Sequence, residues 1–125
     1  MLLARFHLPE VVIENATTPS QSERRSRYSF TSDGDRRRML VAKAYGRGQH
    51  FLGEWHTHPQ SDPTPSACDL QSMAELFVRS VHELNFFVMI IVGNSTPDLS
   101  LWVSLHDASS SHQLELVRVP ASTFL

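Results

Sequence analysis

Residues 53–69, GEWHTHPQSDPTPSACD, place two histidines, a serine and an aspartate within one short stretch of the chain. Residues 50–58 alternate in the manner of a β-strand, and the prolines among residues 59–65 prevent a strand or a helix from continuing until Ser66. From Ser66 onward apolar side chains recur at spacings of three and four, which predicts a helix that buries one face. The side chains on that face are Leu70, Met73, Phe77, Val81 and Leu84. The stretch therefore predicts a strand, a rigid loop and a helix in succession.

Strands and helices alternate along the rest of the chain. Apolar runs and alternating patterns predict strands over residues 10–17, 86–92, 99–105 and 114–119. A helix is predicted from the capping residues Asp33-Gly34-Asp35 to about Tyr45, where Gly46 and Gly48 stop it. The sequence predicts an α/β fold with a central sheet, without giving the strand order.

Length and composition indicate one globular domain. The chain has 125 residues, of which 41% are hydrophobic and 19% are charged. The longest apolar run, residues 86–92, is too short to span a bilayer, and no secretory leader is recognisable, so we expect a soluble cytoplasmic protein. The single cysteine, Cys68, cannot form an internal disulfide, which fits a reducing compartment.

Charge is unevenly distributed along the chain. Residues 1–50 carry nine Lys and Arg against five Asp and Glu, whereas residues 51–125 carry two against eight. Most of the basic excess lies between Arg24 and Arg38, which could attract an acidic partner or a phosphate backbone. The two aromatic residues of this segment, Tyr28 and Phe30, do not alternate with the arginines, so a solvated surface is the simpler interpretation and a nucleic-acid partner is not expected.

The two histidines and the aspartate have the spacing of a metal site. Residues two apart on a strand point to the same face, so His56 and His58 present both imidazoles on one side. The loop can fold back, and the helix places Asp69 in its first turn, where its carboxylate can reach the same point. Two imidazoles, a carboxylate and a position open to water match a catalytic zinc site, in which the pKa of the water falls towards about 7. Ser66 is near enough to donate a hydrogen bond to an oxyanion that forms on an attacked carbonyl.

Each of these residues also has an ordinary structural interpretation. Ser66 and Asp69 form a capping box, so they could serve only to begin a helix. His56 and His58 could be half-buried residues with backbone partners. The complete pattern, His-x-His-Pro followed by Ser and Asp between a strand and a helix, has few such explanations and indicates a metal site.

The remaining candidate ligands are predicted to have structural roles. Cys68 adjoins Asp69 in a first helical turn, so we expect a small buried thiol that does not bind metal. Trp55 and Trp102 are expected to pack in the core. The other histidines show no ligand spacing and are expected at the surface or in the core: His7, His50, His82, His106 and His112.

The segment His56-Thr57-His58-Pro59, the seven-residue gap, Ser66 and Asp69 resemble the signature of the JAMM (JAB1/MPN/Mov34) zinc metalloproteases. Gly53-Glu54-Trp55 before the histidines and Pro65-Ser66 after them resemble the prokaryotic branch of that family, as do residues 11–19 and 28–30. The resemblance covers most of the chain. It implies a JAMM/MPN-like (cytidine-deaminase-like) α/β fold, in which helices flank a central mixed β-sheet.

The resemblance also implies a reaction and its partners. His56, His58 and Asp69 would bind Zn²⁺, and Ser66 would stabilise the oxyanion. The implied reaction is hydrolysis of an amide or isopeptide bond after the C-terminal tail of a ubiquitin-like or otherwise conjugated protein. The branch resembles deconjugating peptidases found beside bacterial ubiquitin-activating-like enzymes, including those of antiphage nucleotide-signalling operons. The implied partners are the conjugated tail and an E1/E2-like conjugating enzyme; no membrane partner is expected.

The chain departs from the family pattern at the general base. Family members carry a catalytic glutamate just before a short glycine-containing step into an apolar run, and residues 1–5 resemble that apolar run itself. The aligned glutamate is therefore expected upstream of Met1, and the single domain, residues 1–125, is expected to lack its first strand or the start of it. Three explanations stay open: the sequence is shortened, the protein lacks the base, or Glu10, Glu14 or Glu54 replaces it.

The sequence leaves three functions open. The first is a zinc isopeptidase. The second is a binding or scaffold module that keeps the fold and the metal but does not cleave. The third is a DNA-repair-associated domain that uses the basic segment on nucleic acid, for which salt-sensitive DNA binding is the test.

Overall fold

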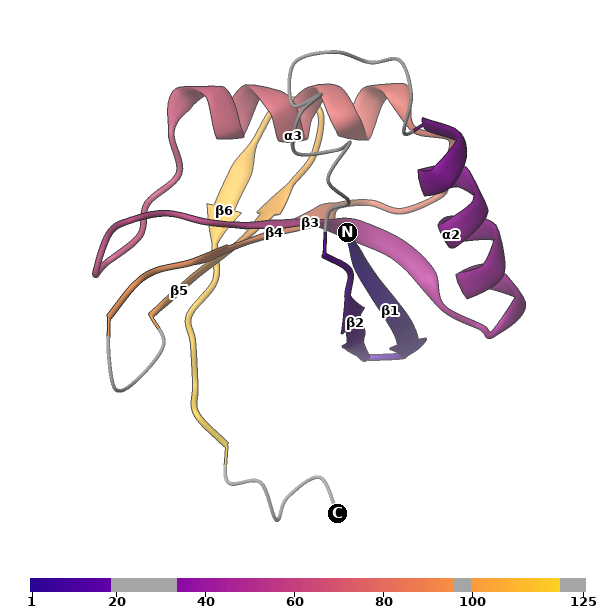
Figure 1. The fold of residues 1–125 in the computed structure, drawn as a ribbon, viewed down its shortest axis with the longest axis horizontal. Coiled ribbons are helices and arrows are strands. Elements are labelled where there is room, and N and C mark those ends of the chain that lie inside the picture. The colour runs from indigo at the N-terminus through magenta and orange to yellow at the C-terminus, as the bar shows by residue number, and fades with distance from the viewer. Residues whose placement is uncertain (19–33, 96–99, 120–125) are drawn as a thin grey trace. The chain divides into compact units, whose positions relative to one another are not determined.

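The computed structural model describes residues 1–18, 34–95 and 100–119 (Figure 1). In chain order, the elements in this part of the chain are β1 (Leu2–His7), β2 (Glu10–Ala16), α2 (Gly34–Gly46), β3 (His50–Thr57), α3 (Ala67–Arg79), β4 (Phe87–Val92), β5 (Leu101–His106) and β6 (Ser111–Gln113). The strand order is β2-β1-β3-β4-β5-β6. The predicted α/β fold is confirmed.

The chain divides into two compact units, residues 1–55 and 56–125, and β3 ends two residues inside the second. That the chain is one domain stays a prediction. None of the helices in the described ranges is long and apolar enough to cross a membrane.

In the first unit, β1 lies between β2 and β3 and is antiparallel to both. The first four side chains of the chain, Met1 to Ala4, are all buried. A strand that is covered on both faces has no alternation of apolar and polar residues, which is why the sequence pattern did not indicate β1.

Helix α2 ends as predicted, at Gly46. Gly48 has φ of +77°, in the left-handed region that favours glycine, and a Cβ atom there would lie 2.6 Å from Nη1 of Arg5. Glycine therefore permits both the turn and the close approach of Arg5, whose Nη2 donates to the Arg47 carbonyl at 2.8 Å. Asp33, the predicted capping residue, lies outside the described residues.

In the second unit, α3 packs against β4 and β5. Phe87, Met89 and Ile91 on β4 are buried, and β4 pairs with β5 in antiparallel register from Phe87↔His106 to Val92↔Leu101. The rings of Phe77 and Phe87 meet edge to face with centroids 5.2 Å apart. Met73 and Phe77 from the predicted helix face therefore join the predicted central strand in the core of this unit, whereas Leu70 is 38% exposed.

The prediction that the second helix continues to Leu84 is wrong, because α3 ends at Arg79. Ser80 adopts an extended backbone, and the ring of His82 replaces the next helical turn. His82 Nε2 donates to the Phe77 carbonyl at 2.9 Å, and its Nδ1 accepts from the Leu84 amide at 3.1 Å. Val81 is fully exposed, so its helical spacing was coincidental.

The predicted strand over residues 114–119 is also wrong. The last strand is β6, Ser111–Gln113, and the alternation of apolar residues begins only after it. The Leu114 amide still donates to the Val103 carbonyl at 2.8 Å, but the residues that follow are not in a strand. Val117 is 75% exposed, so apolar alternation without a pairing partner did not produce a strand here.

Candidate metal centre

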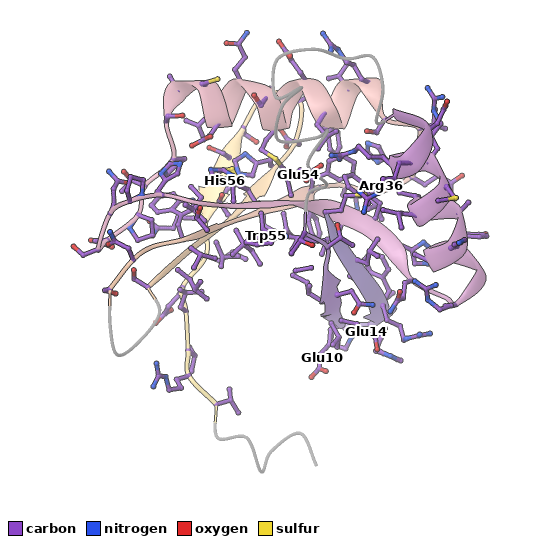
Figure 2. The ribbon with its side chains drawn as sticks, in the orientation of Figure 1. Glu10, Glu14, Arg36, Glu54, Trp55 and His56 are labelled. Atoms are coloured by element: carbon purple, nitrogen blue, oxygen red, sulfur yellow. The ribbon has the colours of Figure 1, made fainter. Side chains whose placement is uncertain are left out.

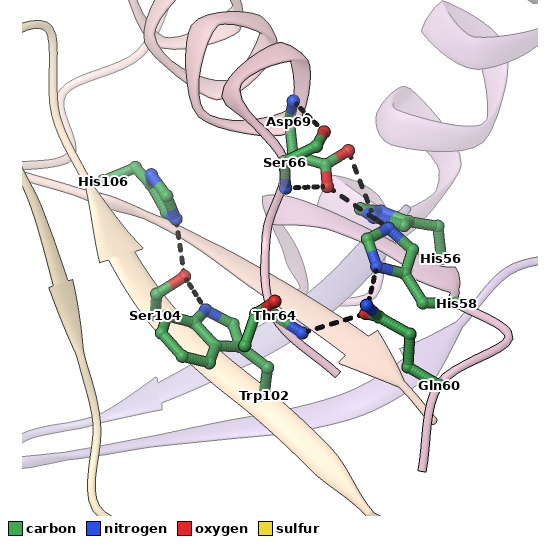
Figure 3. Close-up of polar contacts among 9 residues, drawn as sticks. All are labelled: His56, His58, Gln60, Thr64, Ser66, Asp69, Trp102, Ser104 and His106. Carbon is green, nitrogen blue, oxygen red and sulfur yellow. Dashed lines mark hydrogen bonds and ion pairs between the residues drawn. The ribbon is translucent and has the colours of Figure 1, made fainter. Parts of the chain in front are cut away.

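The end of β3 and the start of α3 bring the predicted ligands together (Figure 3). His56 is the penultimate residue of β3, and His58 follows the strand with its backbone amide hydrogen-bonded to the Val92 carbonyl of β4 at 3.0 Å. Asp69 is the third residue of α3. These three side chains are half-buried, and one donor atom from each lies within 4.8 Å of the others.

The shortest distances between donor atoms are near those found around a zinc ion, although the two histidines approach different oxygens of Asp69. Two ligand atoms about 2.0–2.1 Å from a tetrahedral zinc ion lie about 3.3–3.4 Å from one another. The Nε2 atoms of His56 and His58 are 3.1 Å apart. His56 Nε2 lies 3.3 Å from Oδ1 of Asp69, and His58 Nε2 lies 3.2 Å from Oδ2. The number and type of donors also match a catalytic zinc site, in which three protein ligands leave a fourth position open.

The capping box is present together with this cluster. Ser66 is the N-cap of α3, and its Oγ accepts from the Asp69 amide at 3.0 Å, while Oδ2 of Asp69 accepts from the Ser66 amide at 2.8 Å. The ordinary interpretation of Ser66 and Asp69 is therefore correct, but it does not exclude metal binding. The same hydrogen bonds hold the carboxylate beside the two imidazoles.

The carboxylate of Asp69 is kept in its ionised form. Burial of the carboxyl raises the pKa of Asp69, but the hydrogen bonds from Ser66 and the charges on His56 and His58 together hold that pKa below its usual range. An ionised carboxylate is the form that binds a metal.

Gln60, which the sequence reasoning did not single out, contacts this cluster. Its Oε1 lies 3.3 Å from Nδ1 of His58 and accepts from the Thr64 amide, also at 3.3 Å (Figure 3). The only available signal in the sequence was a polar side chain two residues after the second histidine.

The side chain of Cys68 is exposed, so the prediction of a buried thiol is wrong. Its neighbour Asp69 is the half-buried residue of this first turn of α3. Trp55 is half-buried and its indole nitrogen donates to the Thr17 carbonyl at 2.9 Å. Trp102 is also half-buried, and it donates to Oγ of Ser104 at 3.0 Å.

The three carboxylates considered as the general base lie in residues 1–55 and are drawn in Figure 2. Glu10 pairs in register with His7 at the β1–β2 hairpin and is exposed. Glu14 accepts from Arg5 Nε at 2.9 Å and from Gln49 Nε2 at 3.2 Å. The hydrogen bonds from Gln49 and Arg5 lower the pKa of Glu14.

Glu54 is held by a cationic side chain. Its Oε1 forms an ion pair with Arg37 of α2. Glu54 and Trp55 project to opposite sides of β3 (Figure 2). One oxygen of the carboxylate therefore already has a charged partner.

The basic segment is described only in part. Arg24, Arg25 and Arg27 lie outside the described residues. On α2, Arg37 pairs with Glu54, and Arg38 lies 3.1 Å from Oδ1 of Asp35.

Known proteins are similar in sequence to more than half of the chain. The sequence pattern of the family described as prokaryotic homologs of the JAB domain matches residues 4–104. A protein of Pseudomonas aeruginosa named CD-NTase/cGAS isopeptidase is 35% identical over 72 residues, which are 55% of this chain and 46% of the relative. Proteins with the same name are 32% identical over 83 residues in Enterobacter hormaechei (66% of this chain, 46% of the relative) and 29% identical over 96 residues in Escherichia coli (74% and 56%). The chain spans about half the length of these relatives.

Proposed function

Because the chain belongs to the prokaryotic homologs of the JAB domain, we propose that it provides a zinc-dependent isopeptidase activity. The bond cleaved is the amide or isopeptide bond after the C-terminal tail of a ubiquitin-like or otherwise conjugated protein. The name shared by the relatives, CD-NTase/cGAS isopeptidase, supports both the bond type and a bacterial conjugation or antiphage system. An E1/E2-like enzyme of that system would form the bond that this protein removes.

The observation that carries the proposal is the convergence of two imidazole nitrogens and one carboxylate within 4.8 Å. His56, His58 and Asp69 would hold the ion. When bound there, Zn²⁺ would supply Lewis acidity to the scissile carbonyl and to the attacking water.

Ser66 is proposed to stabilise the oxyanion. Its Oγ accepts from the Asp69 amide at 3.0 Å, which fixes the oxygen at the start of α3 and leaves its hydroxyl hydrogen able to donate. The side chain is exposed beside the metal ligands, so a substrate carbonyl can reach it. A hydrogen bond to the developing oxyanion lowers the barrier when the donor is already in place.

The proton acceptor is proposed to be a residue other than Glu14 or Glu54. A base must have a free lone pair within reach of the proton, and a low pKa weakens it. Arg5 and Gln49 hold the carboxylate of Glu14, and Arg37 holds the carboxylate of Glu54. A glutamate upstream of Met1 stays the predicted base, and Glu10 stays an untested alternative.

The test is cleavage of a ubiquitin-like protein joined through its C-terminal tail to a lysine, with the zinc-loaded protein, after chelation and after zinc is restored. Asp69→Asn keeps an oxygen for the Ser66 amide but removes the charged ligand. We expect more than about 100-fold loss of cleavage, since even outer partners of zinc ligands contribute 10–100-fold. Asp62→Asn, an exposed aspartate in the preceding loop, is the matched control and should cleave normally.

Cleavage that survives complete removal of zinc would contradict the proposal. Zinc binding without cleavage, in the chain as given and with its native upstream residues, would favour the binding or scaffold module instead.

A further inference from the structure

One oxygen of Gln60 faces two nitrogen atoms, one of which is Nδ1 of His58. Oε1 is 3.3 Å from both the Thr64 amide nitrogen and Nδ1 of His58. A backbone amide can only donate, so the atom that faces Thr64 must be the amide oxygen of Gln60. Because that oxygen can only accept, its contact with Nδ1 of His58 is a hydrogen bond when Nδ1 carries a proton.

A proton on Nδ1 of His58 also determines the state of Nε2, the other nitrogen of the ring. A neutral imidazole carries one proton, so a proton on Nδ1 leaves a lone pair on Nε2. Nε2 of His58 is the atom that lies 3.1 Å from His56 Nε2 and 3.2 Å from Asp69. The hydrogen bond to Gln60 therefore uses Nδ1 and leaves Nε2 of His58 as the nitrogen that can bind an ion in the cluster.

Gln60 is itself held by the backbone at the end of β4. Its carbonyl accepts from the Asn94 amide at 2.8 Å, and the nearby His58 amide donates to the Val92 carbonyl at 3.0 Å. Gly93 allows this approach, because a Cβ atom there would lie 2.7 Å from the Gln60 carbonyl oxygen. Two backbone hydrogen bonds and a glycine thus set the position from which the amide reaches His58.

We infer that Gln60 is a positioning residue for the metal centre, which selects the Nδ1-protonated form of His58 and orients its ring. The inference rests on the proposed zinc-dependent function. Outer partners of metal-binding histidines fix the tautomer and raise metal affinity in this way.

The test compares Gln60→Leu, which removes the acceptor, with Gln60→Glu, which keeps one. Zinc affinity is measured by competition with a chromophoric chelator. We expect Gln60→Leu to bind zinc about 10-fold more weakly or worse, and Gln60→Glu to recover most of the loss. Gln71→Leu is the matched control, because Gln71 is also exposed and donates to Glu75 at 3.2 Å on α3. It should bind zinc as the unmodified protein does.

A second measurement does not depend on zinc. In metal-free Asp69→Ala at about pH 8, where an ordinary histidine is neutral and the Asp69 carboxylate no longer faces Nε2 of His58, ¹⁵N NMR of the imidazoles reports which nitrogen carries the proton. We expect His58 in this variant to be protonated on Nδ1, and the added Gln60→Leu substitution to shift it towards a mixture. His58 protonated on Nε2 in Asp69→Ala, or Gln60→Leu with unchanged zinc affinity, would overturn the inference. Failure of the unmodified protein to bind zinc would overturn the proposed function instead, and the NMR result would still decide the role of Gln60.

Discussion

Ser66 has two roles that place different demands on its hydroxyl group. As the N-cap of α3 it uses its oxygen to accept from the Asp69 amide. As the proposed oxyanion donor it uses its hydrogen. A residue that keeps both functions must carry a short side chain with an O–H group, which limits the choice to serine and threonine.

Substitutions at Ser66 separate these two roles. Ser66→Ala removes the cap and the donor, so we expect a loss of about 1 kcal/mol of stability and a fall in kcat of about 10²–10³. Ser66→Thr keeps both groups and should retain most of each. Urea unfolding gives the stability, and cleavage kinetics with zinc in excess give kcat. A Ser66→Ala protein that is less stable but cleaves normally would leave Ser66 with the capping role alone.

At the scale of elements, β5 carries a row of buried polar side chains that is independent of the metal ligands. Trp102 donates to Ser104 at 3.0 Å, and Oγ of Ser104 lies 2.6 Å from Nε2 of His106 (Figure 3). Ser104 and His106 are 1% and 2% exposed. Burial lowers the pKa of His106, and the nearby charge of Asp107 only partly opposes this. Burial therefore favours the neutral imidazole, whose Nε2 forms a hydrogen bond with the Ser104 hydroxyl.

This row predicts how stability depends on pH. Below about pH 6.5 the unfolded chain protonates His106 while the folded chain does not, so the unfolded state binds more protons. The contribution of His106 is therefore present above its unfolded pKa and is lost as the pH falls towards the lower folded value. Urea midpoints between pH 7.5 and 5.5 should fall more steeply for the unmodified protein than for His106→Gln, which keeps an acceptor. Parallel slopes would contradict the assignment.

Local sequence patterns predicted some of these elements and missed others. The strand, loop and helix of residues 50–79 follow from alternation, prolines and a capping box, which are local signals. The buried strand β1 and the early end of α3 depend on burial and on the His82 ring, which no local pattern encodes. Gln60 was missed for the same reason, because its role depends on Gly93 and Asn94, more than thirty positions along the chain.

At the scale of the whole molecule, the proposed ligands and the carboxylates considered as bases fall in different parts of the chain. His56, His58 and Asp69 all lie in residues 56–125, whereas Glu10, Glu14 and Glu54 lie in residues 1–55. Metal binding is therefore expected to depend on the second unit, and the identity of the base is a separate question that zinc binding does not answer.

The measurement that tests the central claim most directly is the zinc content of the purified protein after dialysis against metal-free buffer, set beside that of His58→Ala. We predict about one zinc ion per chain in the unmodified protein, because its donors match a three-ligand zinc site, and almost none in the variant. A protein that retains no zinc, or a variant that retains as much as the unmodified protein, would contradict the assignment of His56, His58 and Asp69 as a metal centre.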